Sequence, residues 1–298
     1  LEVIRIHKNA HPMDALRGAV SCMALSDLDA SSVSPVAAMT KGIRLTSAVA
    51  TMVAAHHRIR NGQMPLAPDP DLGHASNFLY MLFDEVPDAD DARLIDKDLV
   101  LHAEHGVNAS TFAVRVAAST RADFYAAMTA GVSVLKGPLH GGAAEGVWKL
   151  AQDVGSEENA ERYIDDLLKE GGRVMGFGHP VYKTVDPRSV HLKADAKALA
   201  ERKGQPRWFS ILQAVVETRA MQRRARLGVR PNVDFWAGAV CHLLGIAEDL
   251  FISLFTMGRI PGWVAHLVEQ YSKSDILRPR LLYDGPTDLE YVPIDQRG

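Results

Sequence analysis

Apolar residues recur along the chain at the spacing of an α-helix. We expect a first helix to begin near Asp14, with one apolar face made of Leu16, Ala19, Val20, Met23 and Ala24. A longer helix should follow, since Ser34-Pro35 offers a cap and a first-turn proline and Asn61-Gly62 offers a stop signal. Further helices are predicted over residues 72–83, 89–104, 109–118, 122–135, 157–169, 189–202, 208–227 and 261–271.

Alternation with period two, the pattern of half-buried strands, is almost absent. Candidate strands are limited to residues 2–6 and 291–294, so the sequence predicts an all-α fold. The chain has 298 residues, close to the length at which a single hydrophobic core stops growing. We therefore expect two helical domains.

Composition and charge disfavour several classes of partner, although a local patch could still bind an anionic one. The chain carries 33 Lys and Arg residues against 36 Asp and Glu, a net charge of −3, which creates no overall attraction to nucleic acid or to an anionic membrane. The longest nearly apolar stretch, residues 48–55, is far shorter than the roughly 18 residues of a membrane span. No signal peptide is recognisable, and the chain begins at Leu1, as it would after removal of an N-terminal piece.

The two cysteines, Cys22 and Cys241, lie too far apart in sequence for a CxxC redox pair or a zinc knuckle. We interpret them as buried thiols in a reducing compartment, which indicates a soluble cytoplasmic protein. A nucleophilic role for Cys241 beside His242 is disfavoured, because neighbouring residues on a helix point about 100° apart.

Glycines cluster at residues 137–142, 171–172 and 176–178, where the predicted helices break. Glycine lets backbone N–H groups approach a ligand closely, and a helix that starts after such a loop presents its positive end to an anion. Two of these loops carry a histidine, His140 and His179. The alternative is that the glycines only turn corners and the histidines lie on the surface. The spacing matches neither a P-loop nor the GxGxxG motif.

Two further groups of polar residues have a helical spacing. His102 and His105 can share one helix face, but zinc needs a third protein ligand, so ligand contact or helix capping is favoured and no metal is expected. The second group is a basic stripe with spacings of 4, 3 and 4, made of Arg219, Arg223, Arg226 and Arg230. It contains no aromatic residue for base stacking, so we interpret it as a solvated face, with a phosphorylated ligand or nucleic acid as alternatives.

Asp234 stands at an expected helix start, followed directly by Phe235 and Trp236. Taken alone, it is an acid at a helix N-terminus, where the helix dipole stabilises a negative charge. Taken with the two loop histidines, it completes a set of a base, two hydrogen-bond donors and several cations, the latter being Arg188, Arg259 and Arg278. This set suits proton removal from carbon in a polyanionic substrate.

Several segments resemble those of citrate synthases, particularly the shorter bacterial and archaeal type. In chain order they are residues 11–17 (HPMDALR), 101–105 with 108–112, 135–142 (LKGPLHGG), 176–179 (GFGH), 186–188 and 231–235 (PNVDF). The resemblance implies a mostly helical homodimer whose small domain closes over the substrates. It implies a large domain of residues 1–141 and 246–298 and a small domain of residues 142–245.

Two positions depart from the family pattern. Ala144 stands where the family's HGGAN motif has Asn, and Pro180 follows the loop histidine where many bacterial members have Arg. Losing a polar side chain and a cation is expected to weaken acyl-CoA binding or to alter its specificity.

The resemblance also implies a reaction: condensation of acetyl-CoA with oxaloacetate, followed by hydrolysis of citryl-CoA to citrate and CoA. Asp234 would be the base, His140 would donate a hydrogen bond to the enolate oxygen, and His179 would polarise the oxaloacetate carbonyl. The carboxylates of oxaloacetate would be held by His105, Arg188, Arg259 and Arg278, the last of these reaching into the site of the partner subunit. The resemblance further implies a CoA site formed by Met175, Gly176, Phe177, Gly178 and Lys183.

No metal and no cofactor beyond the acyl-CoA substrate are implied. Two alternatives stay open. One is 2-methylcitrate synthase, which would use propionyl-CoA on the same scaffold. The other is a catalytically silent relative that binds CoA or a dicarboxylate.

Overall fold

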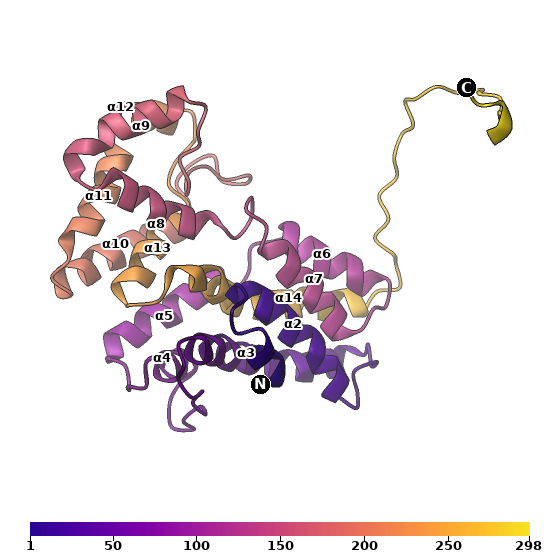
Figure 1. The fold of residues 1–298 in the computed structure, drawn as a ribbon, viewed down its shortest axis with the longest axis horizontal. Coiled ribbons are helices and arrows are strands. Elements are labelled where there is room, and N and C mark those ends of the chain that lie inside the picture. The colour runs from indigo at the N-terminus through magenta and orange to yellow at the C-terminus, as the bar shows by residue number, and fades with distance from the viewer.

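The computed structural model describes residues 1–298, and it contains helices and no β-strand (Figure 1). This confirms the predicted all-α fold. The α-helices are α1 (Glu2–Ile6), α2 (Pro12–Met23), α3 (Pro35–Arg60), α4 (His74–Phe83), α5 (Ala89–His102), α6 (Ala109–Ser119), α7 (Phe124–Leu135), α8 (Ala143–Val154), α9 (Ala160–Lys169), α10 (Pro187–Arg202), α11 (Pro206–Glu217), α12 (Arg219–Arg226), α13 (Val233–Leu243) and α14 (Phe251–Tyr271). Short 3₁₀ turns are η1 (Ala24–Ser26), η2 (Glu157–Asn159), η3 (Glu248–Leu250) and η4 (Ile294–Gln296).

Local capping signals account for the starts of the first long helices. The Ser34 hydroxyl accepts a hydrogen bond from the backbone N–H of Ala37, and Pro35 occupies the first turn of α3 as predicted. At the start of α2, Nδ1 of His11 accepts from the backbone N–H of Met13. Both caps satisfy backbone donors that have no partner inside the helix.

Both predicted strands are wrong. Residues 2–6 form helix α1, whose Ile4 side chain is buried as α1 packs against α2 and α3. Five residues are too few to distinguish a helical from a strand period, so the tertiary contact decided the conformation. Residues 291–294 form no strand, and the last of them, Ile294, begins the 3₁₀ turn η4.

Two helix predictions also differ from the structure. The helix predicted over 208–227 is two helices, because Thr218 ends α11 and its hydroxyl caps α12 by accepting from the Met221 N–H. The helix predicted to begin at Pro261 begins at Phe251 and runs through the proline, since α14 packs against α3, α5 and α6 along its length. Helix α8 was not predicted.

Helices α8 to α13 pack mainly on one another and lie to one side of α1 to α7 and α14 (Figure 1). The two groups meet where α5 contacts α10 and where α14 contacts α8. The structure therefore has a junction between two helix groups. The domain boundaries near residues 141 and 246 stay a prediction.

Helix α14 is the central helix of the larger group. Its segment Glu248–Tyr271 is long and apolar enough to cross a membrane, but 72% of the apolar window is buried inside the fold. Arg259 and Trp263 on this helix are both almost fully buried. We therefore interpret α14 as a core helix. The stretch at residues 48–55 is accordingly not the longest apolar one.

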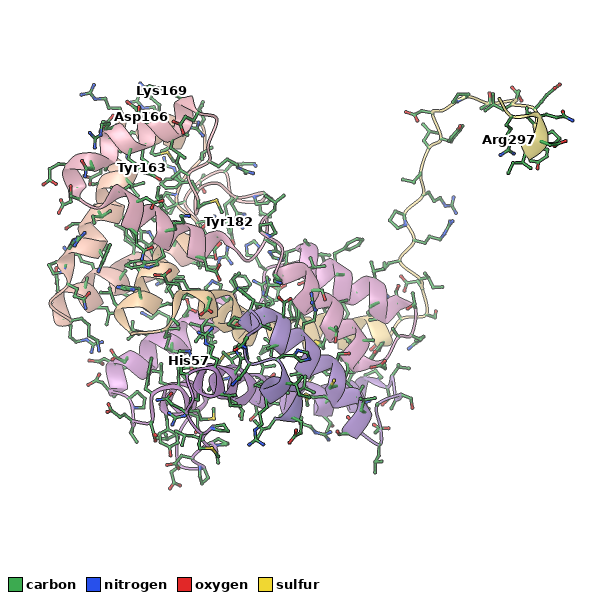
Figure 2. All side chains as sticks on the ribbon, in the orientation of Figure 1. His57, Tyr163, Asp166, Lys169, Tyr182 and Arg297 are labelled. Carbon is green, nitrogen blue, oxygen red and sulfur yellow. The ribbon has the colours of Figure 1, made fainter.

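The chain after α14 is extended. Residues 273–298 contain no helix except η4, and they project away from the helices to Arg297 near the C-terminus (Figures 1 and 2). The backbone N–H of Leu277 donates to the Ser119 hydroxyl at 3.0 Å, which ties the base of this C-terminal tail to α6. Beyond it, large apolar side chains stand exposed, among them Leu281, Leu282, Tyr283 and Tyr291.

Candidate active site

Asp234 lies in the first turn of α13, at the junction of the two helix groups. The Asn232 side chain caps this helix by accepting from the Asp234 N–H at 3.1 Å. Atom Oδ1 of Asp234 is buried and has no hydrogen-bond partner. Burial raises the pKa of Asp234, while the charge of His102 opposes this shift. An unpaired carboxylate with a raised pKa is suited to accept a proton.

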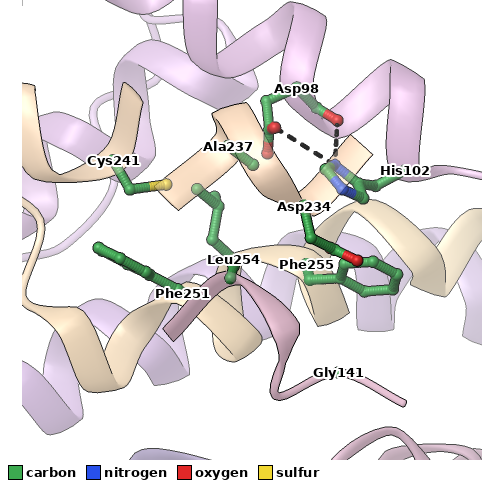
Figure 3. Close-up of a pocket in the computed structure, with 10 residues that line it drawn as sticks. Asp98, His102, Gly141, Asp234, Ala237, Cys241, Phe251, Leu254 and Phe255 are labelled. Carbon is green, nitrogen blue, oxygen red and sulfur yellow. Dashed lines mark hydrogen bonds and ion pairs between the residues drawn. The ribbon is translucent and has the colours of Figure 1, made fainter. Parts of the chain in front are cut away.

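Asp234 faces a small cavity between α5, α8, α13 and α14 (Figure 3). Its other lining residues are Asp98, His102, Gly141, Ala144, Ala237, Cys241, Phe251, Leu254 and Phe255. A side chain at Gly141 would lie 2.4 Å from the Leu135 carbonyl oxygen, so only glycine fits this turn. The predicted glycine loop thus reaches the cavity beside the base.

His140 is held from the other side by the start of α6. Its Nε2 accepts a hydrogen bond from the backbone N–H of Ser110 at 3.3 Å and lies 2.9 Å from the Ser110 hydroxyl. Because Nε2 accepts, the ring proton resides on Nδ1. Burial, followed by the charge of Arg259, lowers the pKa of His140. His140 is therefore a neutral imidazole with one free donor.

His179 has the opposite tautomer. Its Nδ1 accepts from the backbone N–H groups of Val181 at 3.0 Å and Tyr182 at 3.2 Å, so the proton resides on Nε2. Burial and the neighbouring charge of Arg188 lower its pKa. The loop before it turns at Gly176 and Gly178, whose φ angles of +73° and +83° favour glycine.

His105 completes a group of three rings. Its ring centroid lies 4.7 Å from that of His179 and 5.4 Å from that of Tyr182, which stands where the two helix groups face each other (Figure 2). Burial and the charge of Arg188 lower the pKa of His105 to about 4, so this ring is neutral at pH 7.

The expectation that His102 and His105 share one helix face is wrong. Helix α5 ends at His102, and His105 follows in an irregular segment. The two rings consequently point to different surroundings. His102 is buried beside Asp98, whereas His105 meets the loop of His179.

Two arginines stand close to these histidines. Arg188, in the first turn of α10, forms two hydrogen bonds to Asp186 at 3.1 and 2.9 Å. Arg259 is only 2% exposed, donates from Nε to the His102 carbonyl at 2.6 Å, and lies over the Phe255 ring at 4.8 Å. Burial, followed by the charge of Arg188, lowers the pKa of Arg259 to about 10. Two cations that repel each other provide a favourable site for a carboxylate.

Arg278 is not brought to this group in the single chain. It lies exposed in the C-terminal tail, one residue after the contact of Leu277 with Ser119. No side-chain hydrogen bond or ion pair holds it. Its predicted role in substrate binding therefore stays a prediction that requires a second chain.

The predicted CoA residues lie in the loop before α10. Gly176 is buried, and an added side chain there would lie 2.5 Å from Val147, so it serves a close backbone approach. The Phe177 ring lies 4.8 Å from that of Phe235, and Met175 packs over Gly146. Lys183 is exposed, with Nζ 3.4 Å from the His179 carbonyl oxygen. Contact of these residues with CoA stays a prediction.

The other candidates take structural positions. The basic stripe is interrupted, because α12 ends at Arg226 and Arg230 lies outside the helix, where its carbonyl accepts from the Gly178 N–H. Both cysteines are free; Cys241 is buried as predicted, but Cys22 is only half-buried. Burial raises the pKa of the Cys241 thiol, and the adjacent His242 stacks on Trp148 at 3.7 Å instead of pairing with it.

Sequence reasoning missed several residues that shape the site. Ser110 sets the tautomer of His140, Asp186 orients Arg188 and accepts from the Val233 N–H, and Asp98 pairs with His102. Asp186 and Ser110 lie inside segments that resemble citrate synthases, which was the available signal. Asp98 had no such signal, because its position beside Asp234 arises only when α5 meets α13.

Comparison with known proteins gives a consistent result. A family model described as "Citrate synthase, C-terminal domain" matches residues 1–280. Citrate synthase 2 of Bacillus subtilis is 44% identical over 290 residues, covering 97% of this chain and 77% of that protein. 2-Methylcitrate synthase 1 of Corynebacterium glutamicum is 40% identical over 292 residues, covering 96% of this chain and 76% of that protein.

A solved structure of citrate synthase from Thermoplasma acidophilum, a ternary complex with carboxymethyl coenzyme A and oxaloacetate, superposes with a TM-score of 0.92. It shares 29% identity, and the match covers 99% of this chain and 79% of the other. The order of motifs, the fold and these matches agree, and the chain therefore belongs to the citrate synthase family, whose members are acyl-transferring condensing enzymes.

Proposed function

We propose that this protein condenses acetyl-CoA with oxaloacetate and hydrolyses the resulting citryl-CoA to citrate and CoA. The observation that supports this most directly is the grouping of one unpaired carboxylate, Asp234, with two neutral histidines that have opposite tautomers. The reaction needs one base and two hydrogen-bond donors. Nδ1–H of His140 and Nε2–H of His179 are donors whose other ring nitrogen is already occupied.

The first step removes a proton from the acetyl methyl group. A thioester methyl is a very weak acid, so Asp234 can accept its proton only when the enolate oxygen is stabilised as charge develops. Nδ1–H of His140 supplies that hydrogen bond from a buried, neutral ring, a donor worth roughly 3 kcal/mol in the transition state.

In the second step the enolate carbon attacks the carbonyl carbon of oxaloacetate. Nε2–H of His179 polarises that carbonyl and delivers a proton to its oxygen as the new carbon–carbon bond forms. Arg188, Arg259 and His105 bind the carboxylates of oxaloacetate, since a guanidinium can grip a carboxylate through two parallel hydrogen bonds. Water then cleaves the thioester of citryl-CoA.

We further propose that the active unit is a homodimer in the cytoplasm. Arg278 lies exposed in the tail, which projects away from the helices (Figure 1), so Arg278 of the partner subunit would complete the oxaloacetate site. The apolar side chains exposed along the tail favour the same arrangement, because a partner surface would bury them.

The small domain, residues 142–245, is proposed to close over the substrates. Oxaloacetate would contact Arg188 from one helix group and Arg259 from the other, so its binding favours the closed arrangement and builds the acyl-CoA site. Acetyl-CoA should then bind more tightly to the oxaloacetate complex than to the free protein. Calorimetry with and without oxaloacetate measures this difference, and equal affinities would contradict ordered closure.

Thiol release from acetyl-CoA tests the proposed reaction. We expect release that depends strictly on oxaloacetate, with citrate formed in equal amount. Binding of CoA and oxaloacetate by calorimetry without any turnover would instead favour a silent regulator, the reading suggested by Ala144 and Pro180.

The acyl group is the open question, because relatives named citrate synthase and 2-methylcitrate synthase match at similar identity. One methylene in an apolar pocket changes selectivity by only about 1–3 kcal/mol. Side-by-side kcat/KM values for acetyl-CoA and propionyl-CoA decide between the two substrates. We expect the larger value for acetyl-CoA.

A further inference from the structure

His102, the last residue of α5, is a buried histidine that the proposed reaction does not use. Its side chain is 2% exposed, and Nδ1 lies 2.9 Å from the Asp98 carbonyl oxygen and 3.3 Å from Oδ1 of the same residue. A carbonyl oxygen only accepts hydrogen bonds, so Nδ1 carries a proton. The other ring nitrogen, Nε2, is buried without a partner.

Three buried polar atoms without hydrogen-bond partners belong to residues that line the same cavity: Oδ1 of Asp98, Nε2 of His102 and Oδ1 of Asp234 (Figure 3). The cavity has room for about one water molecule, and a buried water needs two to four polar partners. The cavity therefore links the proposed base to a histidine on another helix.

The charges around His102 favour a proton on both of its nitrogens. Asp98 and Asp234 are the carboxylates that influence its charge, Phe255 packs against its ring at 4.5 Å, and Arg259 donates a hydrogen bond to its backbone carbonyl. Burial lowers the pKa of His102, but the charge and hydrogen bonds of Asp98 outweigh burial, and with the charge of Asp234 they raise it.

Asp234 has its own set of charged neighbours. They are His102 and Arg188, which lower its pKa, and Asp98 and Asp186, which raise it. After burial, His102 is the strongest of these influences, and it is the only histidine among them. The Cys241 thiol also lines the cavity, but its raised pKa keeps it neutral.

We propose that His102 is a positioning residue: an imidazolium held by Asp98, whose Nε2–H faces Oδ1 of Asp234 across the cavity and keeps that carboxylate ionised and oriented. This inference rests on the proposed function in that Asp234 is the base. A base must be unprotonated to act, and burial alone works against this. His102 touches no substrate and acts only through Asp234.

The pH dependence of kcat for the full-length enzyme tests this role. In the wild type, kcat should fall on the acidic side of the profile as Asp234 becomes protonated. In His102→Gln we expect the midpoint of this acid limb to move to higher pH by about one pH unit or more, because Asp234 loses its neighbouring cation. Above that limb kcat should return to within a few-fold of the wild type, with KM for oxaloacetate unchanged within about twofold. A limb that does not move, or an equal loss of kcat at every pH, would overturn the proposal.

His56→Gln is the matched control. His56 is also 2% exposed and has two unpartnered ring nitrogens, but it lies on α3 and does not line the cavity. It should leave the acid limb in place. A shift of the same size in His56→Gln would assign the effect to general loss of a buried imidazole, which also overturns the proposal.

Nitrogen-15 NMR of histidine-labelled protein provides a test without substrates. One imidazole should carry two protons at pH 7, and in Asp234→Asn the same ring should titrate at lower pH, since the coupling between two sites is reciprocal. This measurement does not require substitution of His102, so it does not depend on whether a His102 variant folds. A neutral ring, or a titration that Asp234→Asn leaves unchanged, overturns the proposal. This outcome is independent of whether acetyl-CoA is turned over, so it separates failure of this inference from failure of the proposed function.

Discussion

Arg259 and Arg278 are both proposed to bind the carboxylates of oxaloacetate, yet the chain holds them in opposite ways. Arg259 is 2% exposed on the central helix, with Nε hydrogen-bonded to the His102 carbonyl and its guanidinium over Phe255. Arg278 lies exposed in the extended tail without a side-chain partner. Packing within one chain positions Arg259. Only the surface of a second chain can position Arg278.

The same contrast holds for the regions around them. In the buried wall of the site, formed by α5, α13 and α14, neighbouring groups hold the Asp234 backbone N–H, Nδ1 of His102 and Nε of Arg259 in place. In the tail, only the first residues are tied to the rest of the fold: the carbonyls of Lys273 and Asp275 accept from Arg121 and Gln270, and the Leu277 N–H donates to Ser119. We infer that the wall determines the chemistry and that the tail determines whether a site is complete.

The largest effect is expected in the wall, at the proposed base. Asp234→Asn keeps the shape but cannot accept the proton, so kcat should fall by at least about a hundredfold, and by up to about 10⁴, while oxaloacetate binding largely survives. Thiol release and calorimetry measure the two quantities. Asp195→Asn, a carboxylate paired with Lys97 outside the site, is the control and should retain activity. Near-normal turnover in Asp234→Asn would show that Asp234 is not the base.

His140→Ala should have the next largest effect. Loss of the donor to the enolate oxygen should cost about 2.7–4 kcal/mol of transition-state stabilisation, a fall in kcat of about 10²–10³. Ser110→Ala keeps the backbone N–H that sets the tautomer of His140, so kcat should fall much less in this variant than in His140→Ala. If His140→Ala changes KM alone, then His140 is a binding residue.

The tail is tested by complementation. Asp234→Asn and Arg278→Ala should each be nearly inactive alone. In a mixed dimer one site inherits both defects and the other inherits neither, so about half the activity of a wild-type dimer should return if the sites are independent. The measurement is activity after the two variants are unfolded and reassembled together.

Arg278→Ala alone reassembled in the same way is the control for that experiment. It should stay inactive, since every site lacks the arginine. If the mixture regains nothing, Arg278 serves its own chain, and the contrast between wall and tail no longer holds.

The smallest effect is expected on stability. The pKa of His105 is about 4 in the folded protein and lies near 6.5 in an unfolded chain. Between these values the unfolded state binds more protons, so His105 should lower the free energy of unfolding as pH falls from about 6.5 to 4. His105→Gln should show a smaller acid-dependent loss than the wild type in urea unfolding at pH 7 and pH 5. If the free energy of unfolding decreases equally in both proteins between pH 7 and pH 5, then His105 is not desolvated in the site.

Local sequence patterns predicted most of the helices correctly. Capping signals such as Ser34-Pro35 act within one turn, so their consequence is readable without the rest of the chain. The same holds for the glycine loops, because Gly141 approaches the carbonyl of Leu135 only six residues earlier and Gly176 has a φ angle of +73° that favours glycine. The candidate histidines His140 and His179, together with Asp234, were also identified from these signals and from the family resemblance.

The tertiary structure decided the features that depend on contacts between segments distant in sequence. Pro261 lies inside α14 and does not begin it, and residues 2–6 are helical, because packing against neighbouring helices outweighs local preference. The tautomer of His140 depends on Ser110, thirty residues away, and the surroundings of Asp234 depend on Asp98 and His102 of another helix. A hydrogen bond or a charge acts over a few ångströms of space, so sequence determined which groups are present, while only folding determined which of them meet.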